Sequence, residues 1–202
     1  HGLFHIDLQN VTRASTAFRV AGVHNVSECW RPLNFETRTP QLLRTQASTF
    51  LRNAKGNNFP KRGRLPPFQW NEFVEFYEIR DKDDCLIGQF YLDLYARKNK
   101  RGGAWMDEAI SRYKFTSESS TPVAFLTCNF TPPIVNKPIT LTHDEVITLF
   151  HEFGHGLHHL LTEIDEYSVS GIKGVEWDAV ELPSQFMENF CWEWEVVKNM
   201  AH

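Results

Sequence analysis

The sequence has few cysteines and no long apolar run, and each absence excludes a class of protein. Its four cysteines, Cys29, Cys85, Cys128 and Cys191, are scattered through 202 residues and form no C-x-x-C pair. The paired-cysteine motif of redox and zinc sites is therefore excluded, and we expect reduced thiols in a reducing compartment. No segment approaches the roughly 18 consecutive apolar residues of a membrane helix, so we expect no membrane partner.

An initiating methionine is also missing, because the chain begins at His1. We therefore expect a fragment, a processed form or an incomplete gene model. For the same reason, the lack of a signal peptide excludes nothing.

Acidic residues are scarce in the first third of the chain. Residues 1–71 carry ten Lys and Arg against three Asp and Glu, whereas residues 72–202 carry eleven against twenty-two. The change falls at a breaker-rich stretch that ends with Pro66-Pro67. We therefore predict an unassigned basic N-terminal segment, residues 1–68, which could be disordered, followed by a domain of residues 69–202.

The basic segment has three interpretations. Seven basic residues and no acid between Arg38 and Arg64 could attract RNA or a membrane surface. Because aromatic residues are sparse there, we prefer a solvated linker or disordered arm and expect no nucleic-acid partner. An Arg-rich leader for import into an organelle is the third interpretation.

Three segments after residue 69 have the composition of β-strands. Residues Phe73–Ile79 and Leu86–Tyr95 are rich in β-branched and aromatic residues, which predicts a hairpin. Val123–Phe130 is a third strand, ended by Pro132-Pro133. An edge strand of this small sheet either covers the core or pairs with an extended peptide, and the sequence does not decide between these roles.

The clearest helix signal begins at Thr142. Thr142 and Glu145 form a T-x-x-E capping box, and Asp144 complements the positive end of the helix dipole. Apolar residues then recur at steps of three and four, which predicts a stripe packed on a core. Gly154 and Gly156 each cost about 0.8–1.0 kcal/mol of helix stability relative to alanine. We therefore expect another segment to approach the helix closely at these glycines.

This helix contains His151-Glu152-Phe153-Gly154-His155. Residues four apart on a helix lie on one face with Cβ atoms about 5–6 Å apart, which suits two imidazole ligands of one zinc ion. Glu152 is turned by about 100° from His151, where it can take a proton from metal-bound water. The alternative is a polar helix face without metal, and these five residues alone leave both open.

A zinc enzyme needs a third protein ligand, and Glu181 is the candidate. It follows His151 by thirty residues, which allows a loop and a return helix. We expect Asp178 to cap that helix and Pro183 to kink it. Glu188 shares a face with Glu181 and either hydrogen-bonds a ligand histidine or is an exposed acid.

The remaining candidates have ordinary structural interpretations. We interpret His143, His158 and His159 as solvated or packing residues and Glu166 as a surface acid. The glycine-rich segment 168–175 is expected to form a loop that could line a substrate cleft.

Together these segments resemble the M3 family of zinc oligopeptidases, the thimet oligopeptidase family. The likeness is greatest to its bacterial oligopeptidase A branch, covers about residues 70–195 and does not include 1–68. It rests on Tyr91–Arg97, Lys100–Trp105, Phe150–His158, Ser170-Gly171, Glu181–Gln185 and Met187–Asn189.

The resemblance implies His151, His155 and Glu181 as ligands of one Zn²⁺ per chain and Glu152 as the general base. It implies a mainly α fold with a small β-sheet (α+β), the incomplete core of a zincin-like metallopeptidase. The expected partners are short peptide substrates. The expected location is the cytoplasm, or an organellar matrix if a leader is missing. It gives no indication of the oligomeric state.

The chain also departs from the family, whose members are much longer. Their C-terminal part carries His and Tyr residues that stabilise the oxyanion, and this chain ends at His202 before that part. Losing one such donor costs about 10²–10³ in rate. Two functions therefore stay open: a zinc metalloendopeptidase that hydrolyses short peptides, and a truncated, inactive zinc-binding domain that acts as a scaffold or decoy.

Overall fold

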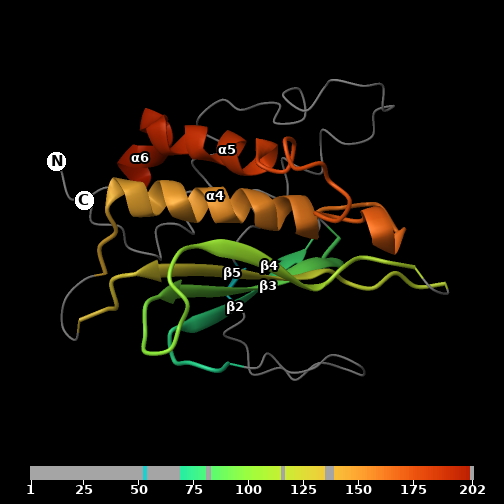
Figure 1. The fold of residues 1–202 in the computed structure, drawn as a ribbon, viewed down its shortest axis with the longest axis horizontal. Coiled ribbons are helices and arrows are strands. Elements are labelled where there is room, and N and C mark those ends of the chain that lie inside the picture. The colour runs from blue at the N-terminus through green and yellow to red at the C-terminus, as the bar shows by residue number, and fades with distance from the viewer. Residues whose placement is uncertain (1–51, 54–68, 81–82, 115–116, 135–138, 201–202) are drawn as a thin grey trace.

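In a computed structural model, the described residues are 52–53, 69–80, 83–114, 117–134 and 139–200. They form three layers: a β-sheet, one long helix across one face of the sheet, and shorter helices on the far side of that helix (Figure 1). Except for Arg52 and Asn53, the basic segment lies outside the described residues. Its predicted disorder and its boundary at residue 69 therefore stay predictions.

The sheet contains five described strands in the order β1-β2-β3-β5-β4. The predicted hairpin is confirmed, since β2 and β3 pair antiparallel. The predicted third strand is β5, which pairs parallel with β3 and antiparallel with β4. Strand β4 was not predicted, and it lies at the edge of the described sheet. The bounds are β1 (Arg52–Asn53), β2 (Val74–Arg80), β3 (Leu86–Tyr95), β4 (Trp105–Ile110) and β5 (Val123–Phe130).

The long helix, α4 (His143–Leu160), begins where the sequence predicts. The amide of Glu145 donates to Thr142 Oγ1 at 3.2 Å, and the amide of Thr142 donates to Glu145 Oε2 at 2.8 Å. Both halves of the predicted capping box are therefore present. Two of the orphan donors at the start of α4 are satisfied by this exchange.

The return helix, α5 (Leu182–Glu188), begins later than predicted. Its N-cap is Glu181, so the prediction that Asp178 caps it is wrong. Residues 176–181 instead form turns of their own, in which the Val180 amide donates to Glu176 O at 3.0 Å. Pro183 lies in the first turn of α5, where its missing amide costs no helical hydrogen bond. Two short 3₁₀ segments, η1 (Tyr167–Val169) and η2 (Asn189–Trp192), and helix α6 (Trp194–Met200) complete the described chain.

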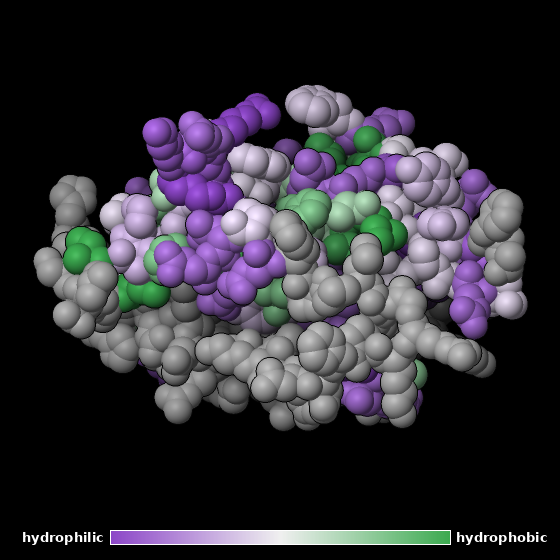
Figure 2. Space-filling view, turned by 90° about the horizontal axis from the view of Figure 1, so that it is seen from below, coloured by the Kyte–Doolittle hydropathy of each residue, from purple (hydrophilic) through white to green (hydrophobic). Residues whose placement is uncertain are grey.

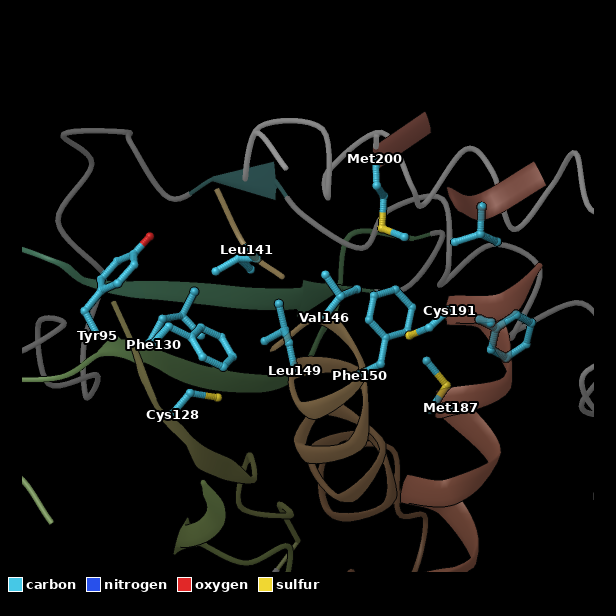
Figure 3. Close-up of a cluster of buried hydrophobic side chains, with 13 residues drawn as sticks. Tyr95, Cys128, Phe130, Leu141, Val146, Leu149, Phe150, Met187, Cys191 and Met200 are labelled. Atoms are coloured by element: carbon cyan, nitrogen blue, oxygen red, sulfur yellow. The ribbon is translucent and has the colours of Figure 1, made fainter. Parts of the chain in front are cut away.

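Helix α4 buries apolar side chains on two sides. Figure 3 shows the larger cluster, where Leu149 and Phe150 of α4 lie among residues of the sheet, α5 and the C-terminal segment. The smaller cluster joins the sheet to the second half of α4 and consists of Ile79, Phe90, Ala124, Leu126 and Leu160. Each fully buried side chain of this size contributes about 1.5–3 kcal/mol. The two clusters hold α4 between the sheet and α5.

Both glycines of α4 lie at close contacts, as predicted. A Cβ atom on Gly156 would lie 3.0 Å from Leu126 Cδ2, at the sheet. A Cβ atom on Gly154 would lie 2.5 Å from Pro183 O and 2.6 Å from Ser184 Cα, at α5. The backbone of α4 therefore touches a side chain on one side and the backbone of another helix on the other.

The described residues form an α+β structure in which strands occupy about as many residues as α-helices. The larger share of helix that we expected is not found in this part of the chain. On the face seen in Figure 2, hydrophobic residues lie in small groups among hydrophilic ones. Within the described segments, no helix combines the length and apolar character needed to cross a membrane.

Candidate metal centre

The three predicted metal ligands lie together between α4 and α5. His151 and His155 project from α4, and Glu181 stands at the N-cap of α5. One donor atom from each lies within 4.8 Å of the others. Glu181 Oε2 is 3.1 Å from His151 Nε2 and 3.2 Å from His155 Nε2. Residues thirty positions apart in the sequence thus present their donor atoms to one point.

The donor set fits a zinc ion in both chemistry and spacing. Two imidazoles and one carboxylate are ligands that zinc accepts, with metal–ligand distances of about 2.0–2.2 Å. Tetrahedral geometry at those distances places neighbouring donor atoms about 3.3 Å apart. The two nitrogen–oxygen separations at Glu181 are close to that value. The side chain of His155 is 11% exposed, that of His151 27% and that of Glu181 45%, so the centre faces solvent on the Glu181 side.

Glu188 fixes the tautomer of His151. His151 Nδ1 lies 2.6 Å from Glu188 Oε1, and a carboxylate can only accept a hydrogen bond. His151 Nδ1 therefore donates, which leaves the Nε2 lone pair directed toward Glu181. Of the two roles that the sequence left open for Glu188, the hydrogen bond to His151 is the one present in the structure. Such carboxylate contacts orient the histidine ligands of many zinc sites.

The ionisation of the other two ligands also suits a cation. Burial lowers the pKa of His155, which favours the neutral imidazole that binds metals. Burial alone would raise the pKa of Glu181. The hydrogen bond from Ser184 and the neighbouring histidines outweigh that effect and hold the pKa below its usual range. Ser184 Oγ lies 2.8 Å from Glu181 Oε2 and 2.8 Å from Glu181 O.

Glu152 lies beside the cluster but outside it. Its side chain is buried, and its carboxylate is not one of the three grouped donors. Burial raises the pKa of Glu152, and the nearby carboxylate of Glu181 raises it further. His151 and a backbone hydrogen bond from Met106 act in the opposite direction. Met106 belongs to β4, so the edge strand of the described sheet lies next to Glu152.

Two other histidines of α4, His143 and His159, have structural contacts, as predicted. His143 Nε2 lies 2.9 Å from Cys191 O, and its ring packs against Trp192. His159 is fully buried, and its Nε2 lies 2.9 Å from Ile110 O. His158 is half-buried and does not belong to the donor cluster.

Of the surrounding segments, the predicted surface acid Glu166 is exposed. The loop prediction for 168–175 holds in part, because Ser168 and Val169 belong to the 3₁₀ segment η1. Gly171 lies against His159 near the end of α4. Whether this loop lines a substrate cleft stays a prediction.

Two residues of the centre, Ser184 and Met106, were not predicted from the sequence. Ser184 follows Glu181 by three positions, a spacing that brings side chains together in a first helical turn, so it could have been found. Met106 contributes a backbone group, which leaves no signal in the residue type.

Comparisons with known proteins show the family to which this chain belongs. The family model described as peptidase family M3 matches residues 52–202, which is well over half of the chain. The chain belongs to peptidase family M3. The predicted family is therefore confirmed, together with the likeness to its oligopeptidase A branch. The match begins before residue 69, so the expectation that the likeness excludes all of 1–68 is wrong for residues 52–68.

Relatives within family M3 align with only part of their own length. Oligopeptidase A of Haemophilus influenzae is 63% identical over 129 residues, which cover 63% of this chain and 19% of that protein. Oligopeptidase A of Escherichia coli is 62% identical over the same shares. The organellar oligopeptidase A of Arabidopsis thaliana is 50% identical over 137 residues, 65% of this chain and 17% of the relative. The alignments thus span less than a fifth of the length of these curated relatives.

Proposed function

We propose that this chain carries the zinc centre of an M3 metalloendopeptidase that hydrolyses short peptides. His151, His155 and Glu181 would hold one zinc ion per chain, within a zincin-like catalytic core. The observation that carries the proposal is the convergence of these three donors, 3.1–3.2 Å apart at Glu181, with Glu152 buried beside them. The names of the relatives, oligopeptidase A, support peptides as the substrate class.

A bound zinc ion would polarise the scissile carbonyl and lower the pKa of a coordinated water toward about 7. Glu152 would accept the proton of the attacking water and then donate it to the leaving amine. Its raised pKa suits this exchange, since a carboxylate of higher pKa holds the proton more readily. Glu188 would hold His151 in the ligating tautomer throughout.

The edge strand β4 would bind the substrate backbone. It lies at the edge of the described sheet, and the amide of its Met106 reaches Glu152. An extended peptide paired with this edge would therefore pass beside the general base. For the location we propose the cytoplasm, as in the name of the probable cytosolic relative of Arabidopsis thaliana. The organellar relative keeps a matrix location open.

Replacing the base separates chemistry from metal binding. Glu152→Gln keeps the size of the side chain and removes its basicity, so we expect unchanged zinc content and a rate of peptide cleavage lower by about 10²–10⁴. Zinc is measured by elemental analysis, and cleavage with a quenched-fluorescent peptide, with and without a chelator. Glu163→Gln, at an exposed position beyond α4, is the matched control.

The same assay decides between the two functional classes. Chelator-sensitive cleavage by the unaltered chain supports the peptidase. Bound zinc without any chelator-sensitive cleavage supports the scaffold or decoy instead. Retained hydrolysis in Glu152→Gln at normal zinc content would refute the role of Glu152.

A further inference from the structure

The third ligand belongs to a different helix from the first two, so something must set the distance between these helices. Glu181 is the N-cap of α5, yet its side chain makes no capping hydrogen bond. Helix N-caps favour Ser, Thr, Asp and Asn, whose short side chains bond to the helix amides. The start of α5 is therefore held by other contacts, and those contacts place Glu181.

The first of these contacts is at Gly154. A Cβ atom there would lie 2.5 Å from Pro183 O, 2.6 Å from Ser184 Cα and 2.9 Å from Pro183 C. All three atoms are backbone atoms and cannot move aside by a rotamer change. Gly154 lies between His151 and His155 in α4, so the point of helix contact and the two imidazole ligands belong to one stretch of helix.

The second contact is at Ser184, which is fully buried. Its hydroxyl lies 2.8 Å from both Glu181 O and Glu181 Oε2, and Oε2 is the atom that faces the two histidines. A hydroxyl shared between these acceptors ties the carboxylate to its own backbone. The carboxylate keeps one orientation, and α5 keeps one distance from α4.

We propose that Gly154 and Ser184 are positioning residues of the zinc centre: Gly154 sets the approach of α5, and Ser184 sets the orientation of the Glu181 carboxylate. This inference rests on the proposed zinc function. A methyl group at Gly154 would push the start of α5 away by about 1 Å to restore normal carbon contacts. Metal sites tolerate ligand displacements of only about 0.2 Å, so Glu181 would no longer complete the centre.

Each position has a matched control in the same chain. Gly156→Ala adds the same methyl group and the same helix propensity to α4, but it meets Leu126 Cδ2 at 3.0 Å, the end of a flexible side chain. Ser170→Ala removes another fully buried hydroxyl, whose oxygen has no hydrogen-bond partner in the described part of the chain. The controls reproduce the bulk and the burial without the link to Glu181.

The test measures zinc affinity of the full chain by competition with a chromogenic chelator. We expect the dissociation constant to rise about 10–100-fold in Gly154→Ala and in Ser184→Ala, the range found when groups supporting a metal ligand are removed. Gly156→Ala and Ser170→Ala should stay within about threefold of the unaltered chain. Ser184→Ala loses a hydrogen bond that Ser170→Ala does not, so its zinc-free thermal midpoint should lie lower by only about 2–5 °C. A protein that stays folded while its zinc affinity falls separates positioning from folding. Unchanged affinity in Gly154→Ala and Ser184→Ala, or equal losses in the controls, would overturn the inference.

A measurement on the zinc-free protein tests the role of Gly154 separately from the proposed zinc function. The amide of Gln185 donates to Glu181 O at 2.9 Å, so its hydrogen exchange reports the first turn of α5. We expect faster exchange in zinc-free Gly154→Ala and no change in Gly156→Ala. If the unaltered chain bound no zinc, the proposed function would fail, and this comparison would decide the inference. Equal exchange in the two variants would refute the role of Gly154.

Discussion

The carboxylate of Glu188 orients the candidate metal ligand His151 through a hydrogen bond to Nδ1, the ring nitrogen that does not face Glu181. The distance of 2.6 Å marks a strong, charge-assisted hydrogen bond. The partner comes from the last residue of α5, whereas Glu181 precedes the first. Both ends of this short helix therefore act on the same histidine, which raises the cost of tilting α5.

Removing the Glu188 carboxylate should weaken zinc binding. We expect Glu188→Ala to raise the zinc dissociation constant about 10–100-fold, because His151 loses the acceptor that fixes its tautomer. Glu188→Gln keeps an acceptor oxygen and should recover part of the loss. The measurement is chelator competition, with Glu176→Ala at an exposed position as control. Identical affinities in Glu188→Ala and the control would show that the hydrogen bond does not support the ligand.

The identities of the candidate ligands could be predicted from the sequence, whereas their support could not. His151 and His155 follow from helix geometry, since residues four apart share a face. Glu181 could be named as a candidate from its place on a return helix. The resemblance to a known family was needed to assign it, because a gap of thirty residues does not fix where the second helix lies. The contact at Gly154 depends on that placement, so the sequence predicted a close approach without its partner.

At the level of elements, local signals succeeded and signals that depend on tertiary contacts failed. Helix α4 begins at its predicted capping box because the two hydrogen bonds are made within four residues. Strand β4 was missed because its residues alternate weakly in character, and its place is fixed by pairing with β5. Asp178 failed as a cap because Pro183 lacks the amide that a helix starting there would need.

The end of β3 is tied to the following turn by one buried carboxylate. The two terminal guanidinium nitrogens of Arg97 donate to the Asp93 carboxylate at 2.6 and 2.7 Å, and Lys100 Nζ lies 2.8 Å from Asp93 Oδ1. The side chains of Asp93 and Lys100 are only 8% and 5% exposed. Burial alone would raise the pKa of Asp93, but the hydrogen bonds from Arg97 and Lys100 hold it below its usual range.

The ion-paired carboxylate of Asp93 predicts that the free energy of unfolding depends on pH. Because the folded pKa of Asp93 is lower than the unfolded one, its stabilisation is fully present above about pH 4 and is lost as pH falls through the folded value. We expect Asp93→Asn to lower the free energy of unfolding by about 3–5 kcal/mol at pH 7, since Lys100 stays buried without its charged partner. The difference from the unaltered chain should shrink at more acidic pH.

The measurement is thermal unfolding of both proteins between pH 7 and pH 3. Asp107→Asn on the exposed side of β4 serves as control and should change stability little. If the loss of stability in Asp93→Asn stayed constant down to pH 3, the pKa of Asp93 would have to be the same in the folded and the unfolded chain.

For the whole molecule, a ligand bridging α4 and α5 should stabilise the fold. A metal that binds only the folded chain adds about 2.7 kcal/mol at a free concentration one hundred times its dissociation constant. For a chain of this size, that corresponds to a rise of about 5–10 °C in the thermal midpoint. Zinc should produce the rise, a chelator should reverse it, and His151→Ala should abolish it. An equal rise in His151→Ala would locate the bound zinc elsewhere.

The order of the strands has a consequence for how the chain folds. Strand β5 follows β3 and β4 in the sequence, yet it lies between them in the sheet. Each of those strands therefore keeps an unpaired edge until β5 inserts, and such non-local, parallel pairing forms slowly. Helix α4 packs on β5 through Leu126, so we expect it to dock after β5 has paired. On this order of events, the metal centre, built on α4 and α5, would form late, and zinc binding would report a completed fold rather than nucleate it.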